Sequence, residues 1–297
     1  MISVLERIHK GEVLVADGAM GTLLFAHGLA GGKCPEEYNL THPDILESIA
    51  RQYLDAGADI VQTNTFGGSP LKLGQYGLAD QAATINRLAV EAAKRAVAGN
   101  AYVSASCGPS GKLLKPYGDT EPAAMKEGFL VQMQALIAAG ADLVCVETMT
   151  DLQEAELAVA AAREISADIP IMATMTFDPT PRGFYTVMGV TIEAAAKRLE
   201  AAGATIIGSN CGNGIEKMIE IAREFKQHTS LPVIIQSNAG VPELRDGKPF
   251  YPETPEFMGQ KTVALMEAGV AIVGGCCGTT PDHIRAIRAA VDNARNH

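Results

Sequence analysis

Three cysteines are the residues of this chain whose type and spacing have the clearest chemical potential. Cys276 and Cys277 are adjacent within residues 274–278 (GGCCG), and Cys211 lies within residues 210–212 (NCG). Three thiolates suit a tetrahedral zinc ion with one coordination position left open, and the open position distinguishes a catalytic zinc site from a structural one. We therefore predict that Cys211, Cys276 and Cys277 bind Zn²⁺.

An adjacent pair of cysteines cannot share one metal ion from within a regular strand, because successive side chains of a strand point to opposite faces. The backbone must therefore turn at this pair. Gly274, Gly275 and Gly278 flank the pair and supply the conformational freedom for such a turn. A redox-active disulfide and two packed core cysteines are the alternative interpretations of the pair.

The chemistry of a zinc site with three sulfur ligands differs from that of a zinc hydrolase. Three thiolates give the site a net negative formal charge, so it is a weak Lewis acid toward carbonyl groups and water. It still binds a fourth thiol as a thiolate, since coordination removes the thiol proton, whereas a free thiol with a pKa of about 8.5 is mostly protonated at neutral pH. The site therefore predicts a thiol substrate that attacks an electrophilic alkyl donor. The chain has no His-Glu-x-x-His motif, which agrees with this reading.

The other three of the six cysteines have different predicted roles. Cys145 falls in the middle of a predicted strand and is expected in the core. Cys107 falls at a strand end, where it could line a pocket, but we do not predict it as a ligand. Cys34 lies in a glycine-rich loop without a recognisable partner. Six scattered cysteines do not form a disulfide framework in a chain of this length.

One pattern of residues occurs four times along the chain, at 55–66, 138–149, 201–212 and 267–278. Each copy has an Ala-Gly pair, a short spacer and an apolar run, which predicts a helix that ends at a glycine and is followed by a buried strand. The predicted helix ends are Gly57, Gly140, Gly203 and Gly269.

Four further apolar runs complete a set of eight predicted strands, at 13–20, 102–109, 171–178 and 233–240. Eight strands that alternate with helices predict a closed (β/α)₈ TIM barrel of the α/β class, formed by a single domain over residues 1–297. A doubly wound open sheet is the alternative, but the even repetition favours closure. Thr41 before Pro43 and Thr280 before Pro281 are the predicted caps of two helices.

The C-terminal ends of the strands form the active site of such a barrel. The predicted sixth and eighth strands, which end at the cysteines, both neighbour the seventh, so the three thiols can meet above that strand. Residues 241–256 are predicted as one long loop after the seventh strand, on the face where loops serve the active site.

These residues and their order resemble the homocysteine S-methyltransferase family over nearly the whole chain. The matching segments are DGAMGT at 17–22, NTFG at 64–67, ET at 147–148, NCG at 210–212, NAG at 238–240 and GGCCGTTPDHI at 274–284. Within the family the chain is most similar to the homocysteine-binding barrel of cobalamin-dependent methionine synthases.

The resemblance implies a substrate site beside the zinc ligands. Its residues are Asp17, Gly18, Ala19, Gly21, Thr22, Glu147 and Asn238. Asp17 and Glu147 would hold the homocysteine ammonium group, and backbone amides from Ala19 to Thr22 would receive the carboxylate. The side-chain oxygen of Asn238 would fill the open zinc position when substrate is absent. Without the family, Asp17 is interpreted as a turn-forming acid and Glu147 as half of a buried ion pair.

The reaction implied by the resemblance is attack of zinc-bound homocysteine thiolate on an activated methyl group to give methionine. The expected donor is a methyl-corrinoid (methylcobalamin) on a separate partner protein, because the chain reaches His297 soon after the predicted eighth helix and has no Asp-x-His-x-x-Gly segment. Betaine and S-methylmethionine are alternative donors. Residues 177–189 and Ser237 depart from the methionine synthase pattern, and both bear on donor identity.

Two interpretations of another class remain. The chain could be a thiol-binding subunit without independent activity, or a barrel lyase with an incidental metal ion. The predicted strands contain no lysine, which disfavours an imine-forming aldolase.

The charge and the N-terminal segment exclude other classes of partner. The net charge is −10 with no stripe of Lys and Arg, which disfavours nucleic acid. Residues 1–18 lack the apolar core of a signal peptide, and no run approaches the roughly 18 apolar residues of a membrane span. We therefore expect a cytoplasmic protein with no membrane contact.

Overall fold

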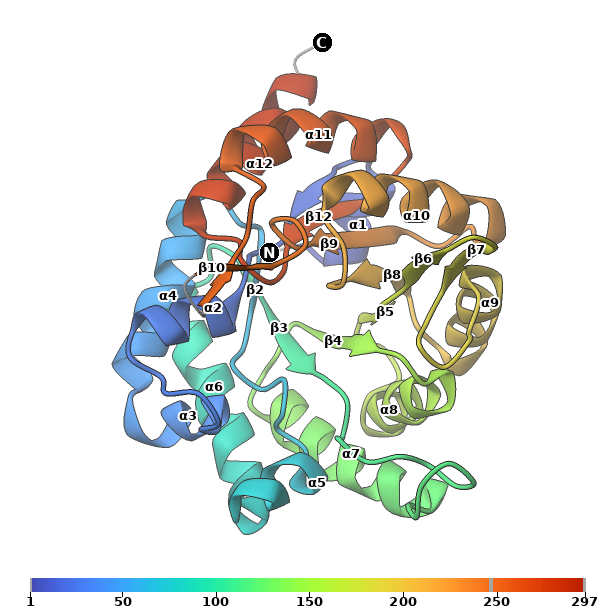
Figure 1. Ribbon diagram of the computed structural model, residues 1–297. Coiled ribbons are helices and arrows are strands. Elements are labelled where there is room, and N and C mark those ends of the chain that lie inside the picture. The colour runs from blue at the N-terminus through green and yellow to red at the C-terminus, as the bar shows by residue number, and fades with distance from the viewer. Residues whose placement is uncertain (1, 246–247, 296–297) are drawn as a thin grey trace.

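Eight parallel strands form a barrel that is surrounded by helices in the computed structural model, which describes residues 2–245 and 248–295 (Figure 1). The strands are β1 (Leu14–Val15), β2 (Ile60–Gln62), β3 (Tyr102–Cys107), β4 (Leu143–Met149), β5 (Ile171–Met175), β8 (Ile206–Asn210), β9 (Val233–Ser237) and β12 (Ile272–Gly275). Their order in the sheet is β1-β12-β9-β8-β5-β4-β3-β2.

The first and last strands of this order also meet, which closes the barrel. A parallel bridge joins Ala16 to Ile60. Asp17 N donates to Ile60 O at 3.0 Å, and Asp59 N donates to Val15 O at 2.7 Å. The prediction of a closed (β/α)₈ barrel is therefore confirmed over the open doubly wound sheet.

Eight long helices cover the outside of the barrel. They are α4 (Pro43–Asp55), α6 (Ala82–Val97), α7 (Pro122–Ala138), α8 (Leu152–Ile165), α9 (Ile192–Ala202), α10 (Ile215–His228), α11 (Pro255–Glu267) and α12 (Pro281–Arg295). Shorter helices are α1 (Val4–His9), α2 (Met20–Ala26), α3 (Tyr38–Thr41) and α5 (Pro70–Leu73), with 3₁₀ turns at Pro35–Glu37, Gly74–Tyr76 and Ala79–Gln81.

The four predicted glycine stops all lie one or two residues after a helix. Gly57, Gly140, Gly203 and Gly269 have φ values of 94°, 90°, 105° and 81°. Glycine adopts this left-handed conformation without the steric penalty of a Cβ atom, so it ends a helix and redirects the chain into the next strand. The repeated Ala-Gly pattern is thereby confirmed as a series of helix-to-strand connections.

Side chains of the strands alternate between two hydrophobic cores. Leu14, Cys145 and Ile272 belong to the core inside the barrel, whereas Val15 belongs to the larger core between the strands and the helices. Val4 of α1 packs into the inner core, which places α1 across the N-terminal end of the barrel. Cys145 is fully buried there, so its predicted core position is confirmed.

The structure differs from the sequence-based expectations at one helix cap. Helix α4 begins at Pro43 as expected, but its N-cap is His42, which makes no capping hydrogen bond. Thr41 instead donates its hydroxyl to the carbonyl oxygen of Glu37 within α3. The Thr41 cap prediction was therefore wrong, because a short helix immediately precedes α4 and uses that side chain.

Two antiparallel hairpins that were not predicted from the sequence extend from the barrel. Strands β6 (Asp178–Thr180) and β7 (Gly183–Tyr185) pair after β5, and strands β10 (Glu243–Arg245) and β11 (Lys248–Phe250) pair after β9. The prediction of one continuous loop over residues 241–256 was therefore wrong. The side chains of the four hairpin strands are largely exposed in the described positions. Hydrophobic periodicity in the sequence therefore gave no signal for these strands.

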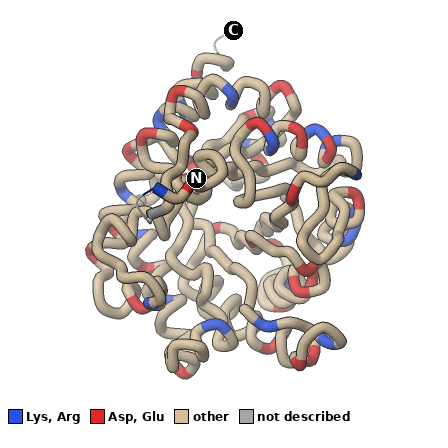
Figure 2. The backbone as a smooth tube through the Cα atoms, in the orientation of Figure 1, with Lys and Arg blue, Asp and Glu red and all other residues tan. Residues whose placement is uncertain are grey.

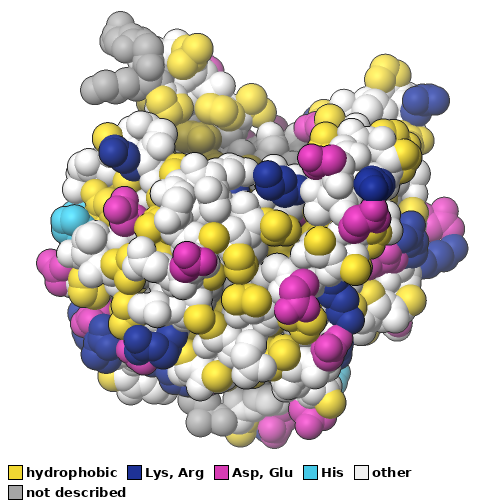
Figure 3. Space-filling view, turned by 90° about the horizontal axis from the view of Figure 1, so that it is seen from below, with side chains coloured by type: hydrophobic (Ala, Val, Ile, Leu, Met, Phe, Trp, Pro, Cys, Tyr) yellow, Lys and Arg dark blue, Asp and Glu magenta, His cyan; other side chains and the backbone are white. Residues whose placement is uncertain are grey.

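The charged residues lie mainly on the outer helices, and the barrel strands carry few of them (Figure 2). Basic and acidic side chains are intermixed on the face shown in Figure 3. No helix among the described residues is both long enough and apolar enough to cross a bilayer.

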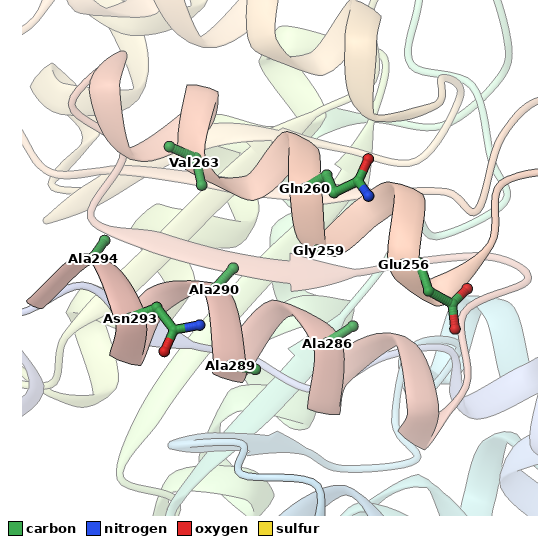
Figure 4. Close-up of a pocket in the computed structure, with 9 residues that line it drawn as sticks. All are labelled: Glu256, Gly259, Gln260, Val263, Ala286, Ala289, Ala290, Asn293 and Ala294. Carbon is green, nitrogen blue, oxygen red and sulfur yellow. The ribbon is translucent and has the colours of Figure 1, made fainter. Parts of the chain in front are cut away.

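A surface groove of about 540 Å³ lies between α11 and α12 (Figure 4). Its lining includes Gly259, Val263, Ala286 and Ala290 from these two helices. None of the cysteines lines this groove, so it is separate from the predicted metal site.

Candidate metal centre and substrate site

The three predicted ligands converge at the C-terminal end of the barrel. The sulfur atoms of Cys211, Cys276 and Cys277 all lie within 4.8 Å of one another, and the Cys211 and Cys277 sulfurs are 3.9 Å apart. Zinc–sulfur bonds of about 2.3 Å in a tetrahedron require sulfur–sulfur separations of about 3.8 Å. The spacing of the three sulfurs therefore fits one zinc ion.

A backbone turn brings the adjacent cysteines to the same side. Strand β12 ends at Gly275, and Thr279 N donates to Cys276 O at 3.1 Å to close the turn. Gly278 lies in this turn with a φ of 80°. The predicted turn at the cysteine pair is present.

Two of the flanking glycines serve a different purpose from the one expected. Gly274 and Gly275 are not among the residues with positive φ. A Cβ atom on Gly275 would lie 2.3 Å from Thr279 Oγ1, and one on Gly274 would lie 2.8 Å from Ala16 Cβ. These two glycines are therefore required by close packing under the turn, and Gly278 alone is required by its backbone conformation.

Cys211 reaches the site through an unusual backbone conformation. Its φ is 62°, a left-handed value that costs a residue with a Cβ atom about 1–2 kcal/mol. Cys211 N donates to Gln236 O at 3.1 Å, and Asn213 N donates to Cys211 O at 2.9 Å. These bonds hold the conformation, which is typical of strain stored at functional sites.

The three thiols affect one another's protonation. Hydrogen bonds from Cys211 and Cys276 lower the pKa of Cys277 to about 3. Hydrogen bonds with the other two cysteines, together with burial, raise the pKa of Cys276 well above its usual value. One thiolate is therefore stabilised by two protonated neighbours, and a divalent cation is the natural counter-charge for three thiolates.

Asp17 is buried next to the candidate metal site, with one of its carboxylate oxygens unpaired among the described residues. Its side chain is 1% exposed, and Oδ2 accepts a hydrogen bond from Gln62 N at 2.7 Å. Oδ1 has no hydrogen-bond partner among the described residues. Burial raises the pKa of Asp17 to about 8 despite the Gln62 hydrogen bond, and the charge of Glu147 adds to the rise.

Glu147 is the second buried acid of the site. Oε1 accepts a hydrogen bond from Ser106 Oγ at 2.6 Å, and Oε2 accepts one from Asn210 Nδ2 at 3.1 Å. Burial raises the pKa of Glu147 to about 7. Neither Glu147 nor Asp17 forms an ion pair within the described part of the chain, so the interpretation of Glu147 as half of a buried ion pair does not hold.

Asn210 connects the acid to the cysteines. Its Nδ2 also lies 2.7 Å from Thr148 Oγ1 and 3.9 Å from Cys276 Sγ. Its Oδ1 accepts hydrogen bonds from Thr148 N and Thr174 Oγ1, both at 2.8 Å. Sequence reasoning missed this role, although Asn210 immediately precedes Cys211 in the NCG motif.

The segment 17–22 packs directly on the cysteine turn. Ala19 N donates to Thr279 Oγ1 at 3.1 Å, and Gly278 N donates to Thr22 Oγ1 at 3.1 Å. A Cβ atom on Gly18 would lie 2.6 Å from Thr279 Oγ1, whereas one on Gly21 would meet nothing within 4 Å. The Ala19 amide therefore already has a partner, and the first amides of α2, which have no acceptor within the helix, begin with that of Met20.

Asn238 lies between the two cysteine-bearing loops. Its N donates to Asn213 O at 3.0 Å, and the next residue, Ala239, donates its N to Cys277 O at 2.9 Å. The Asn238 side chain is 4% exposed, and its Oδ1 has no partner among the residues that the structure describes.

The remaining two cysteines lie elsewhere. The Cys107 thiol contacts Gln132 Oε1 of α7 at 3.4 Å, so it faces the helix layer and does not line the barrel mouth. Cys34 is buried and donates to Glu36 Oε2 at 3.2 Å, a partner that the sequence did not reveal.

Comparison with known proteins agrees with these observations. A family model described as homocysteine S-methyltransferase matches residues 14–291. Methionine synthase of Mycobacterium tuberculosis (strain ATCC 25618 / H37Rv) is 37% identical over 303 residues, which cover 96% of this chain and 25% of that protein. Methionine synthase of Mycobacterium leprae (strain TN) is 37% identical over 299 residues, which cover 94% of this chain and 24% of that protein. The chain spans about a quarter of the length of these relatives.

Solved structures share the architecture. The metallated form of the homocysteine methyltransferase MmuM from Escherichia coli superposes with a TM-score of 0.79 at 23% identity, covering 95% of this chain and 97% of that one. The oxidised form of the same protein superposes with a TM-score of 0.78 at 22% identity, covering 97% of this chain and 99% of that one. At this identity the likeness shows the barrel fold.

Proposed function

We propose that this chain, which belongs to the homocysteine S-methyltransferase family, binds Zn²⁺ through Cys211, Cys276 and Cys277 and methylates the sulfur of homocysteine to give methionine. The observation that carries the proposal is the convergence of three cysteine sulfurs within 4.8 Å of one another. Zinc bound there would remove the proton of the incoming thiol and keep its sulfur nucleophilic. The sulfur then gains the methyl group as the bond from methyl to donor breaks.

The two buried acids suit the ammonium group of the substrate. Asp17 Oδ1 has no partner among the described residues, and no Lys or Arg neutralises Glu147 in that part of the chain. Burial of two carboxylates without a cation is costly, as their raised pKa values show. A bound ammonium would supply the missing positive charge.

The substrate carboxylate would lie near the start of α2. We propose that backbone amides from Met20 to Thr22 receive it, since the first amides of a helix have no partner within the helix. Gly21 faces open space, which allows a ligand to approach the backbone. Asn238 Oδ1, buried and unpaired among the described residues, is the proposed ligand of the open zinc position when substrate is absent.

Zinc K-edge X-ray absorption of the reduced protein tests the core of this proposal. We expect the zinc ion to have three sulfur neighbours and one lighter neighbour in the substrate-free protein. Addition of homocysteine should change this set to four sulfurs. A site that lacks zinc, or whose spectrum ignores homocysteine, would return Cys276 and Cys277 to the redox or core interpretation.

The methyl donor is proposed to be a methyl-corrinoid. The supporting observation is the 37% identity to methionine synthases over most of this chain. Incubation of the purified protein with homocysteine and methylcobalamin, betaine or S-methylmethionine distinguishes the donors. Methionine formed from betaine or S-methylmethionine but not from methylcobalamin would contradict the corrinoid. Homocysteine binding without turnover of any free donor is the result expected of a thiol-binding subunit, and equally of an enzyme that takes its methyl group only from a protein-bound corrinoid.

We further propose that the reaction takes place in the cytoplasm. All six cysteines are free thiols in the structure, and three thiolate ligands require a reducing environment to stay available for metal binding.

A further inference from the structure

Strand β4 loses its regular alternation of side chains at Glu147 and Thr148. Before this point, Cys145 faces the core inside the barrel, and Val146 faces the core between the strands and the helices. Successive side chains of a strand point to opposite faces, so Met149 should face the inside of the barrel, yet it packs in the outer core with Val146. The pairing of β4 with β5 shifts register between Val146 and Met149. One extra residue is therefore inserted here, as in a β-bulge.

Thr148 is the residue at which the backbone turns. Its φ is 58°, a left-handed value that a β-branched residue rarely adopts. The turn brings two neighbouring side chains to one partner, because Asn210 Nδ2 lies 3.1 Å from Glu147 Oε2 and 2.7 Å from Thr148 Oγ1. The side chains of Glu147 and Thr148 therefore point to the same side of the strand, toward Asn210.

The side-chain amide of Asn210 also receives the backbone amide that the bulge displaces. Thr148 N donates to Asn210 Oδ1 at 2.8 Å, which satisfies an amide of the kind that a bulge leaves without a ladder partner. A backbone N–H can only donate, so this bond fixes which end of the Asn210 side chain is the oxygen. Nδ2 must then face Glu147 and the Thr148 hydroxyl, and its two hydrogens suffice for one bond to each.

We propose that Thr148 is a positioning residue of the substrate site, which holds Glu147 in the orientation that receives the ammonium group of homocysteine. The hydroxyl oxygen of Thr148 holds the Asn210 amide, and that amide in turn donates to Oε2 of Glu147. This inference rests on the proposed function, because it requires Glu147 to bind the ammonium group. Backbone strain of this kind is typical of functional sites. Residues 147–148 were matched to the family as a pair, but sequence reasoning gave a role to Glu147 alone.

Calorimetric titration of the zinc-loaded full chain with homocysteine tests the proposal. Thr148→Val keeps the branched shape of the side chain and removes the hydroxyl, and we expect it to bind homocysteine about 3-fold to 10-fold more weakly, the effect of one lost neutral hydrogen bond. Thr148→Ser retains the hydroxyl and should bind like the wild type. Thr205→Val is the matched control. Thr205 is also half-buried and accepts a backbone hydrogen bond, from Ile171 N at 2.9 Å, but it lies at the opposite end of β8 from Asn210.

A second ligand separates the positioning of Glu147 from general support of the pocket. The compound 4-mercaptobutanoate has the thiol and the carboxylate of homocysteine but no amino group. If Thr148 acts through Glu147, Thr148→Val should bind this compound as tightly as the wild type does. Equal weakening for the two ligands, or wild-type affinity for homocysteine in Thr148→Val, would overturn the role of Thr148. Wild-type protein that binds zinc but does not prefer homocysteine to 4-mercaptobutanoate would instead overturn the proposed ammonium site, and the role of Thr148 with it.

Discussion

The side-chain amide of Asn210 donates a hydrogen bond from Nδ2 to Oε2 of Glu147 at 3.1 Å. Asn210 is the last residue of β8 and precedes Cys211. Glu147 lies near the end of β4 and is the acid proposed to bind the substrate ammonium. The bond needs an acceptor at position 147, and a carboxylate offers acceptors on both oxygens. Asn210 therefore couples the position of the acid to the strand that presents the first cysteine.

Replacement of Glu147 by Gln should weaken homocysteine binding by about 10-fold to 100-fold, the range expected for one lost hydrogen bond to a charged group. The substitution keeps the shape of the side chain but removes the negative charge that faces the ammonium. Isothermal titration with homocysteine measures the effect. Glu154→Gln is the matched control, because Glu154 is also buried and hydrogen-bonded, to Ser110 N at 2.7 Å.

The zinc content of both variants should stay at the wild-type level, since neither acid touches a cysteine sulfur by hydrogen bond. Equal loss of homocysteine affinity in Glu147→Gln and Glu154→Gln would show that the effect is a general consequence of removing a buried acid, and it would contradict the ammonium site.

The stability of the substrate-free protein should fall as pH rises toward 8. The folded-state pKa of Asp17 is raised from 3.8 to about 8 by burial, so between these values the folded protein holds a proton that the unfolded chain has released. Stability from this group is therefore present at low pH and lost as pH rises through about 8, with a slope of at most about 1.4 kcal/mol per pH unit.

Urea unfolding of the wild type and of Asp17→Asn between pH 5 and 9 isolates this contribution, because every other titrating group is shared. The wild type should lose stability with rising pH more steeply than Asp17→Asn. Parallel pH profiles for the two proteins would show that Asp17 is ionised in the folded state without substrate.

The barrel could be predicted from the sequence because its signals are local. Gly57 and Gly269 each follow the end of a helix and have positive φ, and a run of apolar residues follows each of them. The end of the helix and the start of the next strand can therefore both be recognised from a few neighbouring residues. The cysteine site followed from the same pattern, since Cys211 and Cys276 come directly after two of the predicted strands.

The partners within the site could not be predicted, because they depend on contacts between distant segments. Ser106 and Glu147 are 41 residues apart and meet only when β3 and β4 pair. Tyr251 packs on Gly278 only after the chain has passed through the β10–β11 hairpin, whose exposed strands carry no hydrophobic periodicity. Gly275 was correctly singled out, but for another reason: the turn folds Thr279 Oγ1 back to within 2.3 Å of where a Cβ atom on Gly275 would lie, which depends on the exact path of the turn.

Cys211→Ala should reduce bound zinc from about one ion per chain to a small fraction, because two thiolates cannot replace the three-sulfur set of a catalytic site. Atomic absorption after dialysis against a weak chelator measures the content. Cys145→Ala is the control: Cys145 is fully buried inside the barrel, so its loss affects packing and should leave the zinc content unchanged. Full zinc retention by Cys211→Ala would remove this residue from the ligand set.

Gly278→Ala should be the most damaging conservative change in the cysteine turn. Position 278 has a φ of 80°, which costs alanine about 1–2 kcal/mol, and the added Cβ would lie 2.1 Å from the Tyr251 ring. Either the turn or the ring must move, and the turn carries Cys277. We therefore expect lower thermal stability and weaker zinc binding together.

Gly31→Ala is the matched control for that variant, because a Cβ atom at Gly31 meets nothing within 4 Å and its φ is not positive. Differential scanning fluorimetry and chelator competition on the two variants give the comparison. If Gly278→Ala kept wild-type zinc affinity while losing stability, the turn would tolerate displacement of Tyr251. The backbone bonds of the turn would then be enough to hold Cys277, among them the bonds from Cys276 N to Ser237 O at 2.7 Å and from Ala239 N to Cys277 O at 2.9 Å.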